Sequence, residues 1–257
     1  MYKIGLKLCS TNTDVYYNES IKLYSVGLFD YIELFVIPDS LDTLKQWQIL
    51  HTQHKIPFII HCPHSMFGFN LAKPEMFQNN VQIYNCVKQF ADALDAPHII
   101  FHGGIDGCIE ETARQLSEFN ESRALIENKP MIPLPNDKGW KQCRGYNISE
   151  IKYILDMVQC GLCLDFGHAI SAAVAQNQEP YNYVEKFLAL NPKMFHLTDK
   201  DNMNNPYDSH LHLGTGQVDL NKIKKMIPDG AFVTLETIKN SKNNLDDFIG
   251  DVQCMRN

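Results

Sequence analysis

A chain of 257 residues with 44% hydrophobic residues has the length and composition of a single domain with one large core. Its 30 acidic and 23 basic residues give a formal net charge of −7, which argues against nonspecific nucleic-acid binding through a broad basic face. The eight cysteines lack the dense spacing of a disulfide framework, and the longest apolar runs are shorter than the roughly 20 residues of a membrane span. The N-terminus reads as an alternating strand rather than an export signal. We therefore expect a reduced, cytoplasmic protein without a membrane partner.

Short runs rich in isoleucine, valine, phenylalanine and leucine recur along the chain between longer amphipathic segments. These runs predict eight strands, at Lys3–Cys9, Tyr31–Ile37, Phe58–Cys62, His98–His102, Ala124–Glu127, Gly161–Asp165, Met194–Leu197 and Phe232–Glu236. Alternating strands and helices imply parallel strands joined by right-handed crossovers. Eight such units most economically close into one α/β domain, a (β/α)8 TIM barrel over residues 1–257, with an open doubly wound sheet as the alternative.

The segments between the predicted strands are typical of helices, for example Phe77–Leu94 and Asn147–Val158. In the second, Asn147 followed three residues later by Glu150 resembles a capping box, and Asp219 can cap a later helix in the same way. The first predicted strand runs into KLCSTNTD, which lacks the glycine-rich dinucleotide fingerprint, and no Walker-type loop occurs in the chain. We therefore expect no nucleotide cofactor.

Two predicted connections are long, and both follow strands at the end of a barrel where active sites form. They run from Lys129 to Tyr146 and from Thr198 to Tyr207. The first carries Lys129, Lys138, Lys141, Arg144 and Trp140 among prolines and a glycine, a composition that suits a cationic lid. Of these residues, Lys138, Lys141 and Arg144 are expected to contact the substrate. The alternative is a solvated loop with ordinary surface lysines.

Residues of the types that bind metals stand at the ends of six predicted strands and in the loop after one of them. They are His61, His102, Glu127, Asp165, His168, His196, Asp208, His210 and Glu236. Each alone is more typical of a hydrogen-bonded structural residue, but the C-terminal ends of barrel strands surround one axis, so these side chains converge on one pocket. Burying five histidines and four carboxylates together without cations would leave like charges unpaired. The pattern therefore predicts a cluster of divalent metal ions.

Mixed imidazole and carboxylate ligation favours zinc, manganese or iron(II) over calcium, which takes mainly oxygen ligands. We expect about one to three ions of zinc or else manganese. Where two ions lie side by side, the Glu127 carboxylate can bridge them. Cys160 and Cys163 form a C-x-x-C motif, but no second cysteine pair stands at zinc-ribbon spacing. We interpret these two cysteines as structural.

Four motifs resemble endonuclease IV, the zinc-dependent apurinic-site endonuclease (AP endonuclease family 2) of the xylose isomerase-like TIM barrels. They are IHCPH with Asn70 downstream, LCLDFGHAISAA, DSHLHLGTGQVDL and TLET, and the resemblance spans nearly the whole chain. It implies metal-assisted hydrolysis of a phosphoester, with abasic DNA as the family's substrate. Among the site residues, we expect catalytic roles for Glu127, Glu236 and His168, and substrate contacts from His64 and Asn70.

The same resemblance implies how the ligands divide among three ions. The first ion would be held by His61, His102 and Glu127; the second by Glu127, Asp165, His196 and Glu236; and the third by His168, Asp208 and His210. A residue of the required type therefore stands at each of the nine ligand positions of the family pattern.

Four features differ from the nuclease pattern, and each weakens the case for duplex DNA as the substrate. Glu33 in YIELFVIP resembles the sugar isomerases, and His64 stands where the nuclease has a tyrosine that enters DNA. The fourth strand ends in HGG rather than HPG, and Ser209 replaces an arginine between two ligands of the third ion. The loops also lack the arginine and aromatic pattern of a protein that bends a duplex and extrudes a nucleotide.

The main alternative is a sugar or sugar-phosphate isomerase or epimerase of the same superfamily. Such an enzyme would use a single ion held by Glu127, Asp165, His196 and Glu236. Glu127 and Glu236 would then shuttle a proton beside a polarised carbonyl, and His168 would touch the substrate.

The remaining ligand-type residues, His61, His102, Asp208 and His210, have no required role in that one-ion chemistry. Their presence favours phosphoester hydrolysis at a centre of up to about three ions. A metal-bearing barrel that serves only as a binding module is a third possibility.

Overall fold

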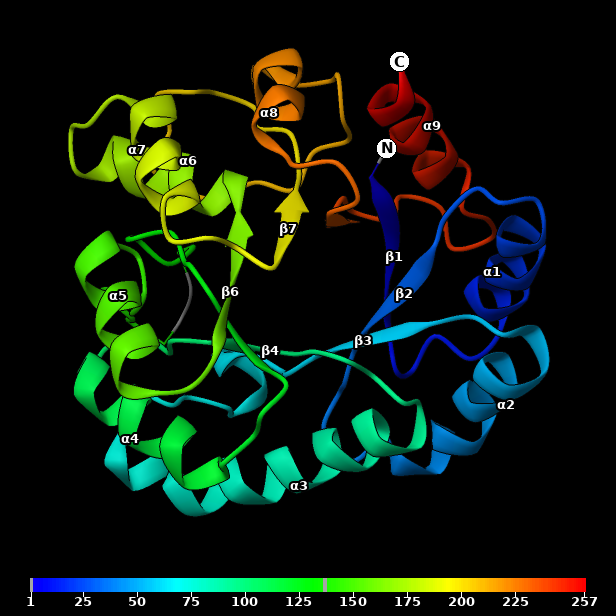
Figure 1. The fold of residues 1–257 in the computed structure, drawn as a ribbon, viewed down its shortest axis with the longest axis horizontal. Helices are drawn as coiled ribbons and strands as arrows, with labels where there is room; N and C mark the ends of the chain where they lie inside the picture. Colours follow the sequence, from blue (N-terminus) through cyan, green and yellow to red (C-terminus); the bar gives the residue numbers. More distant parts are fainter. Residues whose placement is uncertain (1, 136–137) are drawn as a thin grey trace.

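A computed structural model describes residues 2–135 and 138–257, in which eight parallel strands surround a central axis (Figure 1). The strands are β1 (Lys3–Cys9), β2 (Tyr31–Phe35), β3 (Phe58–His61), β4 (Ile99–His102), β5 (Ala124–Glu127), β6 (Gly161–Asp165), β7 (Met194–Leu197) and β8 (Phe232–Leu235). Each strand pairs with the next, and β8 pairs with β1, so the sheet is a closed barrel. The predicted (β/α)8 barrel is confirmed, and the open sheet is excluded.

Helices cover the outside of the barrel and connect successive strands (Figure 1). The α-helices are α1 (Val15–Ser25), α2 (Leu44–His54), α3 (Phe77–Ala93), α4 (Ile109–Phe119), α5 (Ile148–Met157), α6 (Phe166–Ala175), α7 (Pro180–Leu188), α8 (Leu220–Met226) and α9 (Asp246–Arg256). Short 3-10 helices lie at Leu41–Thr43, Ser65–Phe67 and Pro74–Met76. Within the described part of the chain, no helix combines the length and apolar character that a membrane span requires.

The ends of these elements follow local chemistry that the sequence already indicates. Asn147 caps α5 by accepting a hydrogen bond from the backbone N–H of Glu150 at 2.8 Å, and Asp219 caps α8 through Lys222 at 3.0 Å. Four observed strands are one or two residues shorter than predicted, because ladder pairing stops where the chain turns into the loops. Glu236, for example, lies just beyond β8.

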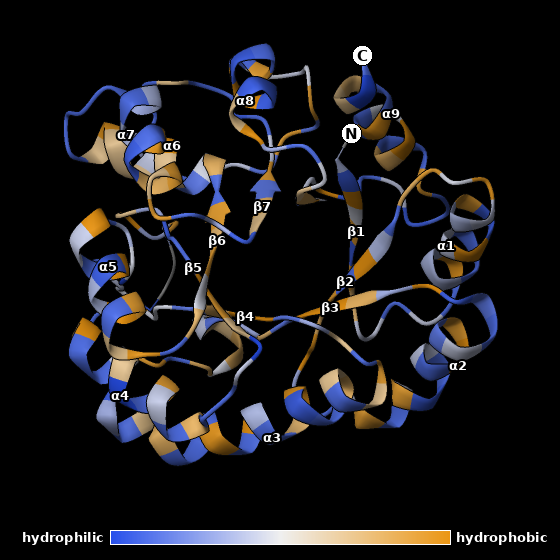
Figure 2. Ribbon diagram, viewed as in Figure 1, coloured by the Kyte–Doolittle hydropathy of each residue, from blue (hydrophilic) through white to orange (hydrophobic). Residues whose placement is uncertain are grey.

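The hydrophobic core has an outer layer between strands and helices and an inner layer inside the barrel. Figure 2 shows hydrophobic residues along the strands, and hydrophilic residues alternating with them along the surrounding helices. The inner layer consists of Tyr31, Ile59, Ile100, Leu125, Cys163 and Met194. Because alternate side chains of a strand face the same side, the residues two positions further along these strands also point into the barrel.

Candidate metal centre

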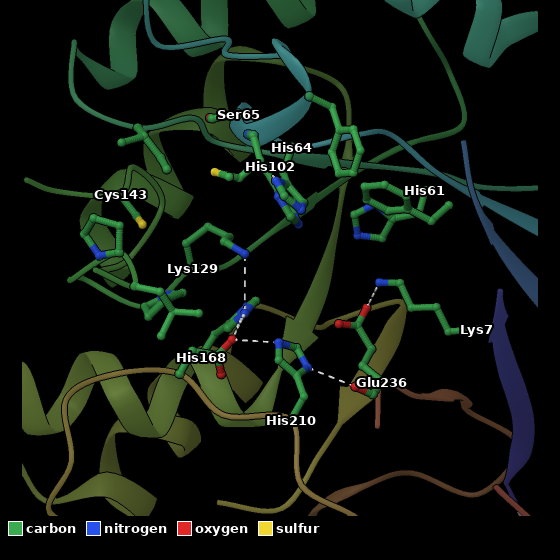
Figure 3. Close-up of a pocket in the computed structure, with 18 of the residues that line it drawn as sticks. Lys7, His61, His64, Ser65, His102, Lys129, Cys143, His168, His210 and Glu236 are labelled. Atoms are coloured by element: carbon green, nitrogen blue, oxygen red, sulfur yellow. Dashed lines mark hydrogen bonds and ion pairs between the residues drawn. The ribbon is translucent and has the colours of Figure 1, made fainter. Parts of the chain in front are cut away.

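The second inward-facing layer of the barrel consists of ionisable side chains. It contains Glu33, His61, His102, Glu127, Asp165 and His196, each two residues beyond a member of the apolar inner layer, together with Lys7 of β1 and Glu236 after β8. Above this layer a cavity of about 690 Å³ opens, lined by loops from the C-terminal ends of the strands. Figure 3 shows His61 and His102 on one side of this cavity and His168 and His210 on the other. Because successive inward-facing positions of a strand are two residues apart, the apolar layer is followed directly by the layer of ionisable side chains.

The Glu127 carboxylate lies at the centre of the cluster and is fully buried. One of its oxygens, Oε2, is 3.0 Å from His61 Nε2, 2.9 Å from His102 Nε2 and 3.6 Å from His196 Nδ1. The other, Oε1, is 2.9 Å from His168 Nδ1. The predicted bridging position of Glu127 agrees with this arrangement, because one carboxylate faces imidazoles from four different elements.

Second interactions fix the orientation of several of these imidazoles. His61 Nδ1 lies 2.6 Å from the Cys62 carbonyl oxygen, and His210 Nδ1 lies 2.9 Å from the Glu236 carbonyl oxygen. Because a carbonyl oxygen only accepts, both Nδ1 atoms carry the proton, and both Nε2 atoms are directed at carboxylates. An imidazole that donates through one nitrogen and faces anionic ligands with the other has the typical orientation of a metal-bound histidine.

Several buried polar atoms in the cluster lack a hydrogen bond among the described residues. They are Glu33 Oε1, Glu127 Oε1, Asp165 Oδ2 and His196 Nδ1. Three of them lie at ion-pair distance from a neighbour but without the geometry of a hydrogen bond. The other carboxylate oxygen of Asp165 accepts from the backbone N–H of His168 at 2.6 Å and so caps α6. Unsatisfied atoms in a buried cluster are costly, and coordination of a cation would satisfy them.

Ligand atoms from four sets of residues lie within 4.8 Å of one another. The sets are His61, His102 and Glu127; Glu127, Asp165 and His196; His168, Asp208 and His210; and Glu33, His61, His196 and Glu236. The His61, His102 and Glu127 set and the His168, Asp208 and His210 set are the same as two of the sets inferred from the resemblance. The Glu127, Asp165 and His196 set is the same as the other inferred set except that it lacks Glu236. The Glu236 carboxylate nevertheless lies beside this set, 2.8 Å from His196 Nδ1. The residues present therefore fit divalent cations with mixed nitrogen and oxygen ligands.

The third set, His168, Asp208 and His210, lies in a strongly negative potential. Burial opposes protonation of His168, yet the carboxylates of Asp165 and Asp208 raise its pKa to about 10. Burial likewise opposes protonation of His210, but Asp208 raises its pKa to about 9. Such shifts mark a position where the surrounding carboxylates favour added positive charge.

Lys7 and Glu33 were not predicted as site residues, although both occupy inward positions of their strands. Glu33 Oε2 lies 2.8 Å from His196 Nε2 and accepts a hydrogen bond from the Thr234 hydroxyl at 2.6 Å. Its other oxygen pairs with Lys7 Nζ at 3.1 Å, and Lys7 also pairs with Glu236. Glu33 thereby holds His196 with Nδ1 directed at Glu127 and Glu236. The period of two in KIGLKLC and YIELF was the signal that could have identified both residues.

The five predicted substrate contacts occupy two kinds of position. His64 lines the cavity, and its ring packs against Phe35 and Phe67. Lys138, Lys141 and Arg144 are not among the lining residues, and Arg144 instead pairs with Glu150 at 3.2 Å. The cavity contains other lysines: Lys7, Lys129 and Lys239. Direct substrate contacts from Lys138, Lys141 and Arg144 stay a prediction.

Asn70 is buried, does not line the cavity, and forms hydrogen bonds with the backbone of a neighbouring loop. Its Nδ2 donates to the Ile105 carbonyl at 2.9 Å, and its Oδ1 accepts from the Ile105 N–H at 3.0 Å. Gly104 has a φ of +96°, and a Cβ at this position would lie 2.4 Å from Asn70 Oδ1. The second glycine of the HGG sequence therefore allows this close approach beside His102.

Comparison with known proteins places the barrel in a family. A family model described as xylose isomerase-like TIM barrel matches residues 22–257. The chain belongs to this family. A probable endonuclease 4 from Aquifex aeolicus is 27% identical over 219 residues, which cover 75% of this chain and 73% of that protein.

Solved structures of other proteins share the fold across nearly the whole chain. A D-tagatose 3-epimerase-like protein has a TM-score of 0.71 at 20% identity, covering 99% of this chain and 96% of the other. Endonuclease IV from Thermus thermophilus has a TM-score of 0.69 at 17% identity, covering 99% of this chain and 97% of the other. The predicted resemblance is thus confirmed at the level of the family, and the two structures share its fold.

Proposed function

We propose that this protein is a metal-dependent phosphoester hydrolase related in chemistry to endonuclease IV. The observation that carries the proposal is the position of the surplus ligand-type residues. His61 and His102 contact the Glu127 carboxylate, and His210 lies 2.9 Å from Asp208. A one-ion mechanism has no required role for the surplus residues, which are His61, His102, Asp208 and His210. Hydrolysis at several ions would use all four as ligands.

The residues would hold the ions in overlapping sets. The first set is His61, His102 and Glu127, the second is Glu127, Asp165 and His196 with Glu236 beside them, and the third is His168, Asp208 and His210. Bound divalent ions, zinc or else manganese, would polarise a phosphoryl group and acidify a water molecule.

The protein's own side chains prepare this chemistry by fixing positions in advance. Glu33 orients His196, and Lys7 holds the Glu236 carboxylate at the edge of the cavity. Because these groups are buried and hydrogen-bonded before a substrate arrives, little reorganisation is needed during the reaction.

The shape of the cavity supports a small phosphoester, or one nucleotide of a chain, as the substrate. The cavity of about 690 Å³ has apolar walls from Phe35, Phe67, Leu134 and Trp140. That volume is in the range of small-molecule pockets. The net charge of −7 gives no general attraction to a duplex, so abasic DNA is a substrate to be tested beside small phosphoesters.

A sugar isomerase or epimerase is the second candidate, and the position of Glu236 favours it. Glu127 and Glu236 both lie next to His196, at 3.6 Å and 2.8 Å from its Nδ1, and Glu236 lines the cavity. Two carboxylates beside a single ion could move a proton on and off a sugar carbon. The endonuclease-type proposal has the advantage of explaining the third set.

The test is a substrate panel assayed with protein reconstituted with zinc or with manganese. The panel contains an abasic oligonucleotide, p-nitrophenyl phosphate, bis(p-nitrophenyl) phosphate and a range of ketoses. We expect phosphoester turnover that His210→Ala lowers by at least about tenfold, because the variant loses one ligand of the third set. His54→Ala, at an exposed histidine at the end of α2, is the matched control and should change nothing. Ketose conversion that survives His210→Ala, without phosphoester turnover, would replace the proposal by the second candidate.

A further inference from the structure

Lys129 is a lysine of the cavity wall at the start of the loop expected to act as a cationic lid, and it was not among the residues predicted to contact the substrate. It follows Asn128 directly after β5, is half-buried and lines the cavity. Its backbone N–H donates to the Gly145 carbonyl at 3.0 Å, which fixes the start of its loop. Figure 3 shows its side chain extending toward His168, and the two nitrogen atoms, Nζ and Nε2, are 3.4 Å apart.

The hydrogen-bonding capacity of the Lys129 ammonium is mostly unused. An ammonium has three donors, and among the described residues Nζ of Lys129 has one polar neighbour, His168 Nε2 at 3.4 Å, a ring nitrogen that also faces the Asp208 carboxylate. Lys7, on the opposite wall, pairs with the carboxylates of both Glu33 and Glu236. Across residues 2–135 and 138–257, Lys129 forms no comparable ion pair. Donors of Lys129 are therefore available to an anionic ligand in the cavity, which could pair with the ammonium directly.

Lys129 places a positive charge on the wall of the cavity, which also carries His64 and His102. Lys129 also lies against the third set of ligands, so a cation bound there would be a second positive charge beside it. Two adjacent cations facing one cavity form a site for an anion.

We propose that Lys129 binds anionic oxygens of the substrate's phosphoryl group, beside the set formed by His168, Asp208 and His210. The assignment rests on the proposed function and deepens it by naming the residue that recognises the phosphoryl charge. It differs from the sequence-based prediction, which gave this role to Lys138, Lys141 and Arg144. Those three cations lie outside the cavity lining, whereas Lys129 lines the cavity with Nζ 3.4 Å from His168 Nε2.

The experiment measures the binding of inorganic phosphate to zinc-reconstituted protein by titration calorimetry. Lys129→Met keeps the length of the side chain and removes its charge, and Lys129→Arg keeps the charge. Lys152→Met, at an exposed lysine of α5 outside the cavity lining, is the matched control. Because hydrogen bonds to a charged group contribute strongly, we expect Lys129→Met to weaken phosphate binding by about tenfold or more. Lys129→Arg should restore most of the affinity, and Lys152→Met should bind phosphate like the wild type.

Two further readouts separate a binding role from a structural one. Metal content and the thermal unfolding midpoint of Lys129→Met should match those of the wild type, because Lys129 is not among the ligands. For turnover of p-nitrophenyl phosphate, KM should rise more than kcat falls. Equal phosphate affinity in Lys129→Met and the wild type, or an equal loss in Lys152→Met, would overturn the assignment.

Failure of the proposed function would have a different signature. If the wild type binds phosphate through Lys129 but hydrolyses no phosphoester, the anion site stands and the proposed hydrolase activity falls. If the wild type hydrolyses phosphoesters and Lys129→Met is unaffected in both binding and KM, only the assignment of Lys129 falls. Absence of phosphate binding by the wild type also counts against Lys129, whatever the turnover measurements show.

Discussion

Replacement of Glu127 by glutamine should remove more metal than any other single change of a ligand. The carboxylate belongs to both the first and the second of the three sets proposed to hold ions, and it contacts His61, His102 and His168 at 2.9–3.0 Å. Glutamine keeps the shape of the side chain but loses the charge and one of the two oxygen ligands. Loss of an outer partner of a ligand typically lowers metal affinity by about 10- to 100-fold. Loss of a shared ligand should therefore lower affinity by at least about 100-fold, or about 2.7 kcal/mol, at both sets.

The assay is elemental analysis of purified protein after equilibration with buffered zinc. We expect the metal content to fall from about three ions per chain to about one, since the His168, Asp208 and His210 set does not contain Glu127. Glu111→Gln makes the same chemical change at a buried glutamate of α4 that pairs with Arg114, and it should leave the metal content unaltered. A Glu127→Gln protein that retains the full complement of ions would show that the carboxylate is not a shared ligand, and the site as described would be wrong.

Three other predictions concern the third set, the core and an ion pair. His210→Ala should lose one ion per chain with the others retained, while His54→Ala loses none; elemental analysis that gives equal content for both would contradict the third set. Trp47 is fully buried and donates to the Ser10 carbonyl at 2.8 Å, so Trp47→Ala should lower the free energy of unfolding by about 3–5 kcal/mol in denaturant titrations. A loss below about 1 kcal/mol would refute that packing argument. Hydrogen bonds from Arg123 lower the pKa of Glu121 from 4.5 to about 2, so its stabilising effect is complete above pH 4.5 and is lost as the pH falls toward 2. Unfolding measured over this range should lose less stability in Glu121→Gln than in the wild type, and equal slopes would count against the assignment.

The repeating pattern of the sequence was sufficient for the fold and for most of the metal-ligand types. Strand-length apolar runs separated by amphipathic segments have few ways to fold, and eight of them in alternation favour a closed barrel. Since parallel strands of a barrel all point the same way, ligand-type residues at their C-terminal ends must meet near one axis. His61, His102, Glu127, Asp165 and His196 could therefore be placed together without coordinates.

The substrate side of the cavity depended on tertiary contacts that the sequence did not reveal. Lys138, Lys141 and Arg144 were selected by composition, but the direction of a loop side chain is set by its partners. Arg144 turns to Glu150, whereas Lys129, at the start of the same loop, points at His168.

The pairing of Glu33 with His196 and Lys7 also required the folded barrel, because these residues come from three different strands. Glu33 and His196 are 163 positions apart in the chain, and nothing local relates them. The sequence by itself determined which residue types surround the barrel axis, because strand direction and a period of two are local properties. Only the tertiary structure decided which nitrogen of each histidine faces the carboxylates and which lysine faces the cavity, because those orientations depend on neighbours from distant parts of the chain.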